Sequence, residues 1–250
     1  MGDEMEKIVE ILKNNPAVKT ILKGKGQIVT NEASDEAYLI ASAFLLQPRT
    51  MIIVKESQYQ AMQLYTSLQN MINDVVYFPS DESLRVEAVA YSYELLGERV
   101  NALNALCENK PVIVVAHTHS VIRYVSSPEV FKENKLALHV GQVIEPSMLR
   151  KQLISMGYQV TQRVDTPFYM SKRGGVIDVF SIQYESPIRI EFFDDEIDTI
   201  SFYDKDTQRR SENVKEVEIL PATDMLYRNE EVDQVVEDIK ALKAKSSLEG

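Results

Sequence analysis

The sequence has a single cysteine, Cys107, three histidines and no tryptophan among its 250 residues. One cysteine excludes an internal disulfide and a zinc site built from cysteines, and it fits a chain in the reducing cytosol, which is the expected location. Cys107 falls on the apolar stripe of an expected helix, where a buried, inert thiol is far commoner than a nucleophile. His117 and His119 end a strand with no Cys, Asp or Glu at ligand spacing, so no metal site is predicted.

An excess of positive charge is also lacking. The chain has 27 Lys and Arg against 38 Asp and Glu, a net charge of -11 and an isoelectric point near 4.9. Because phosphate binding depends on clustered Lys and Arg, we expect these residues not to bind nucleic acid by themselves. No apolar run approaches the ~18 residues that a membrane span needs, and the acidic N-terminus is unlike a signal peptide.

A phosphate-binding loop is missing as well. Such a loop needs Gly-x-x-x-x-Gly-Lys-Ser/Thr, in which backbone N–H groups surround the phosphates and the hydroxyl holds magnesium. The segment 23–27 has two glycines and two lysines but lacks the Gly-Lys-Ser/Thr end. We interpret it as a tight turn and predict no cofactor. No Ser-His-Asp order, nucleophile elbow or isolated carboxylate pair stands out, so these residues are not predicted to form an enzyme.

The composition, with 44% hydrophobic and 26% charged residues, is typical of a globular protein. The length of 250 residues is enough for one large or two small domains. The first part alternates helices with strands, which predicts an α/β fold with a doubly wound, mainly parallel sheet over residues 1–134. Helices are expected at 4–12, 36–46, 58–71, 94–107 and in a short segment capped by Thr118. Strands are expected at 28–30, 51–54, 75–78 and 112–116, the last three as buried strands.

A second domain is expected over residues 135–222, with 223–250 returning toward the first and containing a charged helix at 230–245. Its order is strand 136–140, helix 146–156 stopped by Gly157, strand 159–164, loop 165–172, a three-stranded meander and a closing strand 214–220. This order predicts an α+β module with a helix on one face of an antiparallel sheet.

The meander consists of 176–180, 188–193 and 197–203, with the acidic run 194–196 as a solvated turn. Alternation in its second strand places three apolar side chains on the core face: Ile188, Ile190 and Phe192. Arg189, Glu191 and Phe193 then share the other face. Arginine beside an exposed ring is typical of interface hot spots. From spacing alone, a Phe half-covered by the Arg stem is the open alternative.

Residues 173–180, 187–198 and 204–209 resemble the hallmark segment shared by the excinuclease protein UvrB and the transcription-repair coupling factor family. Two departures are Ser181, where that family has Pro, and Arg210, where it has Ser. Similarity at 77–84, 98–103 and 140–158 extends the resemblance over most of the chain from about Leu39 to Ala222, weakly at first and strongly from Val140. UvrB has an intact phosphate-binding loop and the coupling factor's N-terminal module has lost it, so this sequence resembles the coupling factor more.

The resemblance implies a degenerate fold like that of P-loop NTPases, with no Walker A motif, interrupted by an inserted domain like domain 2 of UvrB. It implies that this domain docks the excinuclease protein UvrA through Arg173, Arg189 and Phe193, as a non-catalytic, monomeric module that recruits UvrA to stalled RNA polymerase. RNA polymerase, DNA, ATP and magnesium would then be bound by other parts of a longer protein. The alternative is a divergent UvrB-like, ATP-dependent DNA-repair helicase.

Overall fold

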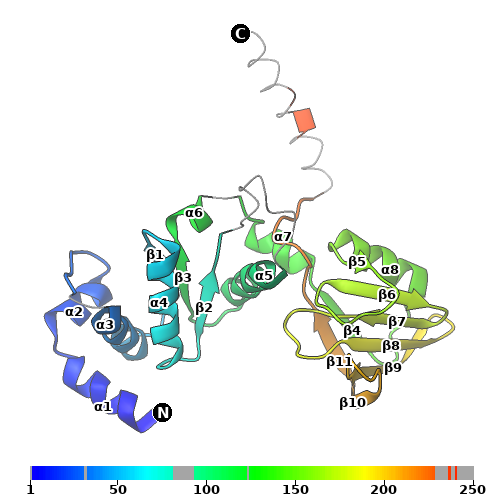
Figure 1. The fold of residues 1–250 in the computed structure, drawn as a ribbon, viewed down its shortest axis with the longest axis horizontal. Helices are drawn as coiled ribbons and strands as arrows, with labels where there is room; N and C mark the ends of the chain where they lie inside the picture. The colour runs from blue at the N-terminus through cyan, green and yellow to red at the C-terminus, as the bar shows by residue number, and fades with distance from the viewer. Residues whose placement is uncertain are drawn as a thin grey trace. The chain divides into compact units, whose positions relative to one another are not determined.

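The computed structural model describes residues 2–30, 33–80, 93–122, 124–228, 236–237 and 240. The chain divides into two compact units, Met1–Arg123 and Tyr124–Gly250 (Figure 1). The expected helix at 230–245 lies outside the described residues apart from three positions, and the domain limits given above stay predictions. Within the described part of the chain, none of the helices combines the length and the apolar character that crossing a bilayer requires.

The first unit contains a three-stranded parallel sheet in the order β1-β3-β2. Its strands are β1 (Met51–Lys55), β2 (Val75–Phe78) and β3 (Ile113–His117). Its helices are α1 (Gly2–Leu12), α2 (Pro16–Lys23), α3 (Ala33–Leu46), α4 (Gln58–Gln69), α5 (Tyr93–Cys107) and α6 (Thr118–Val121). The predicted alternation of helices and strands is therefore confirmed, and the mixed α/β class with it.

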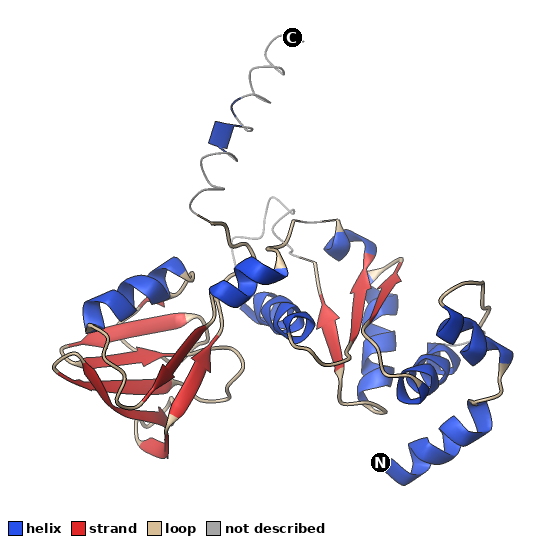
Figure 2. Cartoon of the chain, turned by 180° about the vertical axis from the view of Figure 1, so that it is seen from behind, coloured by secondary structure: helices blue, strands red, loops and turns tan. Residues whose placement is uncertain are grey.

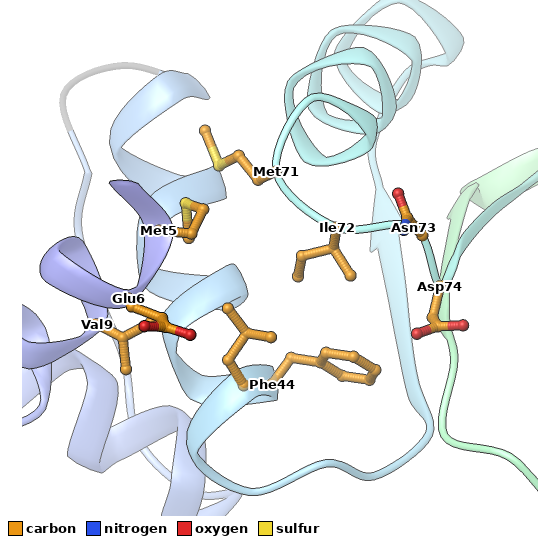
Figure 3. A pocket seen from close by; sticks show the side chains of 9 residues that line it. Met5, Glu6, Val9, Phe44, Met71, Ile72, Asn73 and Asp74 are labelled. Atoms are coloured by element: carbon orange, nitrogen blue, oxygen red, sulfur yellow. The ribbon is translucent and has the colours of Figure 1, made fainter. Parts of the chain in front are cut away.

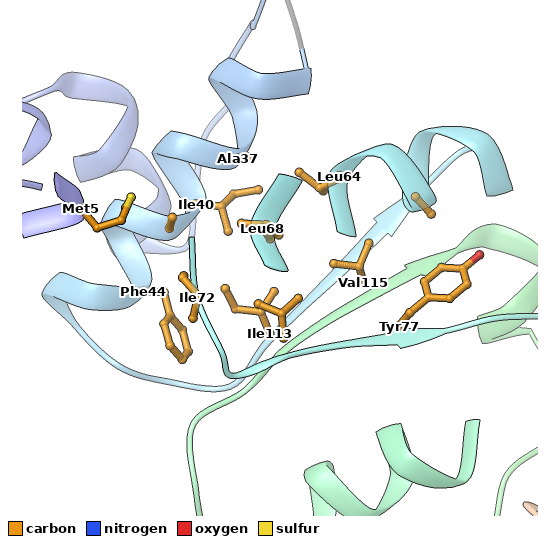
Figure 4. Close-up of a cluster of buried hydrophobic side chains, with 13 residues drawn as sticks. Met5, Ala37, Ile40, Phe44, Leu64, Leu68, Ile72, Tyr77, Ile113 and Val115 are labelled. Carbon is orange, nitrogen blue, oxygen red and sulfur yellow. The ribbon is translucent and has the colours of Figure 1, made fainter. Parts of the chain in front are cut away.

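The core of this unit lies between the sheet and helices α1, α3 and α4 (Figure 4). Ile113 and Val115 of β3 belong to it, and Val114 and Ala116, which alternation places on the opposite face, are buried as well. The expectation that β1 is fully buried is wrong. Ile52 and Val54 are exposed because β1 is an edge strand, and only alternate residues face the core.

Three local expectations in the first unit need correction. Helix α2 was missed, although the Asn15 side chain accepts a hydrogen bond from Ala17 N at 2.8 Å and Pro16 begins the helix. The expected strand at 28–30 does not form. His117 is the N-cap of α6, where the Ser120 hydroxyl accepts from His117 N at 3.1 Å, so Thr118 is the first helical residue.

The second unit contains a six-stranded sheet in the order β10-β9-β8-β7-β6-β5 and a two-stranded sheet of β11 and β4 (Figure 2). Its strands are β4 (Leu136–His139), β5 (Gln159–Val160), β6 (Tyr169–Arg173), β7 (Val176–Val179), β8 (Ile188–Phe193), β9 (Glu196–Tyr203), β10 (Arg210–Val214) and β11 (Glu216–Ile219). Its helices are α7 (Pro128–Glu133) and α8 (Pro146–Ser155). All neighbours in the larger sheet are antiparallel except β5 and β6.

The meander strands are confirmed almost residue for residue, but the sheet is larger than predicted. The expected loop 165–172 contains most of β6, which pairs with β7. The closing strand is β11, and it pairs with β4 instead of extending the meander, while β10 fills that place. Strand β10 escaped prediction because its residues are polar and mostly exposed, so no alternation of apolar side chains marks it.

One face of the six-stranded sheet is apolar. Register places Ile177, Ile190 and Ile200 in one cross-strand row, all fully buried. Ile188 continues the same face in the next row and is also fully buried. The core assignment of Ile188 and Ile190 is thereby confirmed, whereas Phe192 is half-buried.

Candidate partner-binding face

The pairing of β6 to β9 places the three predicted contact residues on one face of the sheet. Residues directly opposite each other in a sheet share a face, as do alternate residues along one strand. Arg173 pairs with Val176, which pairs with Glu191 of β8. Arg189, Glu191 and Phe193 alternate along that strand. Arg173, Arg189 and Phe193 therefore all lie opposite the isoleucine rows, on what we call the polar face.

The Gly174-Gly175 pair creates this arrangement. It is the two-residue turn between β6 and β7, and Gly174 has a φ of 57°, a conformation that strains any residue with a Cβ. A Cβ on Gly175 would lie 3.2 Å from the carbonyl oxygen of Phe192. The turn decides which face of the sheet Arg173 occupies. The alternation of side chains along the sequence cannot predict this face, because the chain reverses at the glycine pair.

A β-bulge brings Glu196 beside Phe193. Pairing runs from Glu191 with Thr199 directly to Phe192 with Ile197, so Asp198 of β9 is an extra residue. The extra residue shifts the alternation of β9 by one. Ile197 consequently returns to the apolar face, where it is fully buried, and Glu196 pairs with Phe193 on the polar face.

Arg189 binds a carboxylate of its own sheet. Its Nε and Nη2 donate to the two Asp178 oxygens at 2.7 and 2.9 Å, and its guanidinium carbon lies 4.5 Å from the ring centre of Tyr203. The Asp178 side chain is only 5% exposed and that of Arg189 21%. Hydrogen bonding to Asp178 raises the pKa of Arg189 above its ordinary value. Such bidentate pairs fix the orientation of the side chains and form stronger hydrogen bonds than neutral groups do.

The segment 161–168 covers this part of the polar face. The Tyr203 hydroxyl donates to the carbonyl of Val164 at 3.1 Å, and Arg173 Nη2 donates to the carbonyl of Gln162. Burial, followed by the Asp178 charge, raises the pKa of Tyr203. We call the buried group of Asp178, Ser201 and Tyr203, with Arg189 at its edge, the covered half.

The other part of the polar face is open. Phe193 is 74% exposed, so the alternative of a Phe covered by the Arg stem is wrong, because Arg189 stacks on Tyr203 instead. Between Arg189 and Phe193, the Glu191 carboxylate accepts from Thr199 Oγ1 at 2.9 Å and pairs with Arg210. We call the end of the face around Phe193 and Glu196 the open half.

Sequence reasoning missed Asp178 and Tyr203 as partners of Arg189. The sequence contains only part of the information needed to pair Asp178 with Arg189. A two-residue turn at Gly174-Gly175 fixes the register of β6 against β7. The register of β7 against β8, which brings Asp178 opposite Arg189, depends on the longer connection 180–187. The position of Tyr203 beside Arg189 could not be predicted from the sequence, because the bulge in β9 changes which of its residues face the same side of the sheet.

The segment 23–27 lacks the setting of a phosphate-binding loop. Gly24 is the C-cap of α2, with a φ of 67°, and its N–H donates to the carbonyl of Ile21. This loop therefore follows a helix C-terminus, whose partial charge is negative, whereas phosphates bind at helix N-termini.

The described part of the first unit contains an apolar pocket and a pair of neighbouring histidines. A pocket of about 540 Å³ (Figure 3) is lined mainly by apolar side chains, with Glu6 and Asp74 as its charged groups, which disfavours an anionic ligand. Burial, and next the charge of His119, lower the pKa of His117. Among the residues that the structure describes, no group of three or more His, Cys, Asp or Glu side chains is placed to hold a metal ion.

Comparison with known proteins matches residues 136–225 to the family described as the UvrB interaction domain. The chain is 30% identical over 243 residues to a transcription-repair-coupling factor of Bacillus subtilis, covering 94% of this chain and 21% of that protein. Over most of its own length this chain is therefore similar to transcription-repair-coupling factors. Those of Staphylococcus haemolyticus and Staphylococcus aureus (strain USA300) are also 30% identical, over 209 residues, 83% of this chain. The chain spans about a fifth of the length of the curated relatives it matches.

The matched domain coincides with the part of the fold that contains the polar face. Residues 136–225 run from the first residue of β4 past the end of β11 and include the whole six-stranded sheet. The resemblance noted in the sequence is confirmed by these matches.

Proposed function

We propose that this chain is a non-catalytic recruitment module that binds UvrA through the polar face of its second unit, as UvrB does. The single observation that supports this most strongly is the exposure of Phe193, at 74%, on the same face as Arg173 and Arg189 within a UvrB interaction domain. In a longer protein, the module would bring UvrA to RNA polymerase stalled on DNA.

The proposed contact combines one ring and two guanidiniums. Phe193 would enter a pocket on UvrA and lose its contact with water there, and the arginines would donate charge-assisted hydrogen bonds to acidic groups around it. Nε and Nη2 of Arg189 already donate to Asp178, so the ion pair holds the guanidinium in place before binding. Such preorganisation lowers the entropy that binding costs.

The fold of the first unit supports a module without nucleotide. A parallel sheet flanked by helices suits a degenerate relative of the P-loop NTPases, and the segment 23–27 has neither the residues nor the helix N-terminus of a phosphate site. We therefore propose that ATP and magnesium bind elsewhere in the longer protein. Calorimetric titration of the chain with magnesium-ATP should give no heat of specific binding. Micromolar binding would favour the helicase alternative.

The test is a calorimetric titration of UvrA with this chain and with two matched variants. Phe193→Ala should weaken binding by about 2–4 kcal/mol, the range of interface hot spots. Tyr59→Ala is the control, because Tyr59 on α4 is an aromatic of similar exposure, 71%, in the other unit, and should bind like the unchanged chain. Both variants should keep their melting temperature. A chain that does not bind UvrA, or a Phe193→Ala variant that binds normally, would overturn the proposal.

A further inference from the structure

A second exposed apolar side chain lies in the same cross-strand row as Phe193. Phe193 pairs with Glu196 of β9, and Glu196 also forms an antiparallel bridge with Val143 in the segment between β4 and α8. The side chains of Phe193, Glu196 and Val143 therefore share one face of the sheet. Val143 is 67% exposed.

Backbone hydrogen bonds hold Val143 in this position. Gly141 N donates to the carbonyl of Ile197 at 2.8 Å, and Ile197 N donates to the carbonyl of Gln142 at 2.9 Å. Ile144 N donates to the carbonyl of Asp195 at 2.7 Å. The segment 141–144 thus continues the sheet beyond β9 for a few residues, and its exposed valine sits on a fixed backbone instead of a loose loop.

The row is of a size that one pocket can span. Neighbouring strands lie about 4.8 Å apart, so Phe193 and Val143 are separated by about 10 Å across Glu196. Two exposed apolar side chains on one rigid row are unusual for a surface that only faces water, since scattered single residues are the norm.

Charge around the row is opposite in sign to that of the two arginines on the same face. The turn before Glu196 contains Asp194 and Asp195, so the β9 side of this face is acidic. Arg173 lies at the same end of the sheet but on β6, two strands away from Phe193, and Arg189 lies four residues back along β8. A partner that covers the whole face must therefore present acidic groups to the arginines and basic groups to the turn. This pattern admits one orientation of the partner and disfavours the reversed one.

We propose that Val143 is a further contact residue for the partner that binds Phe193, and that the row of Phe193, Glu196 and Val143 fits an apolar pocket on that partner rimmed by basic side chains. The proposal rests on the proposed function, because its partner is UvrA. It adds a residue outside the hallmark segment and the sign of charge that must surround the pocket.

The first test measures UvrA affinity for Val143→Ala against Val160→Ala. Val160 on β5 is the matched control, because it is a valine of the same sheet with 53% exposure and lies on the opposite edge strand. Val143→Ala should weaken binding about fivefold or more, and Val160→Ala should leave it unchanged. In the double variant with Phe193→Ala, the two losses should not add, because both side chains enter one pocket.

The second test reverses charge. Glu196→Lys should weaken binding about tenfold at low salt, and the loss should shrink as salt rises, because the repulsion is between solvent-exposed charges. Glu185→Lys, an exposed position in the connection between β7 and β8, changes net charge equally and should have little effect.

The outcomes separate the two proposals. If the chain binds UvrA and loses that binding with Phe193→Ala, while Val143→Ala and Glu196→Lys bind like the unchanged chain, the pocket proposal is overturned and the proposed function stands. Equal losses with Val143→Ala and Val160→Ala would also overturn it, since position would then not matter. If the unchanged chain does not bind UvrA, both are overturned.

Discussion

The covered and open halves of the polar face each contain a carboxylate and an aromatic ring, but in opposite surroundings. In the covered half an arginine, a carboxylate and an aromatic ring satisfy each other: Arg189, Asp178 and Tyr203. In the open half an aromatic ring and a carboxylate, Phe193 and Glu196, are paired only through the backbone register and face solvent. An Arg-aromatic pattern in a strand therefore does not by itself indicate a binding surface, because the register decides whether the sheet already uses those groups.

Removing the arginine of the covered half should have the largest effect on folding. Arg189→Ala leaves the buried Asp178 carboxylate without its bidentate partner, and breaking such a pair costs about 3 kcal/mol of unfolding free energy. Chemical denaturation measures the loss.

Arg209→Ala is the matched control, since Arg209 is exposed in the turn before β10, and its unfolding free energy should stay within about 0.5 kcal/mol of the unchanged chain. Equal stability of the two variants would show that the ion pair contributes nothing, and the division into halves would lose its main support.

Removing only the Tyr203 hydroxyl should have a smaller effect. Tyr203→Phe keeps the ring beneath Arg189 but loses the hydrogen bond to the Val164 carbonyl, which should lower the unfolding free energy by about 1 kcal/mol. Thermal unfolding detects this loss, and Tyr59→Phe, at an exposed tyrosine, should melt with the unchanged chain. A Tyr203→Phe variant of unchanged stability would mean that segment 161–168 covers the face without being held by this bond.

The second unit should also lose stability in alkali. Burial raises the pKa of Tyr203, and likewise of Tyr158, whose hydroxyl donates to the Leu220 carbonyl. Unfolded tyrosine ionises near pH 10, below the folded value, so above that pH the unfolded state releases protons that the folded state keeps. Stability should therefore be constant below about pH 10 with respect to these groups and fall above it.

The alkaline loss is measured by denaturation at several pH values. Tyr203→Phe should show a shallower fall above pH 10 than the unchanged chain, because one of the two groups is gone. Parallel curves for the two proteins would assign the loss to other residues.

The smallest expected effect concerns DNA, because the chain should not bind duplex DNA through the open half. Its acidic residues and the net charge of -11 oppose phosphate, so a gel shift with duplex DNA at ~150 mM salt should show no complex at low micromolar chain. A complex that Arg173→Ala abolishes would mean that this arginine recognises nucleic acid instead of an acidic protein surface.

Much of the fold follows from local patterns in the sequence. The alternation in Ile188–Phe193 predicted both the strand and its core face, because burial on one side enforces period two. Segments without that period were missed: β6 and β10 are strands because β7 and β9 offer backbone partners, a property of the neighbouring strands and not of their own side chains. Helix α2 was missed because it is short, although its Asn-Pro start was visible.

The candidate site was predicted in its residues but not in its contacts. Parity placed Arg189 and Phe193 together, and the resemblance added Arg173, which the Gly174-Gly175 turn brings to the same face. Parity could not reveal the Asp178 ion pair, the Tyr203 ring or Val143, because each depends on the pairing of segments distant in sequence. That Arg173, Arg189 and Phe193 contact UvrA stays a prediction.

The most direct test of the division into halves is to measure melting temperature and UvrA affinity on the same two variants, Phe193→Ala and Tyr203→Phe. The structure predicts opposite results: Phe193→Ala keeps its melting temperature and loses UvrA affinity at least about tenfold, whereas Tyr203→Phe melts lower and, while folded, binds UvrA like the unchanged chain. A Phe193→Ala variant that melts lower but binds normally, with Tyr203→Phe stable and unable to bind, would contradict the account.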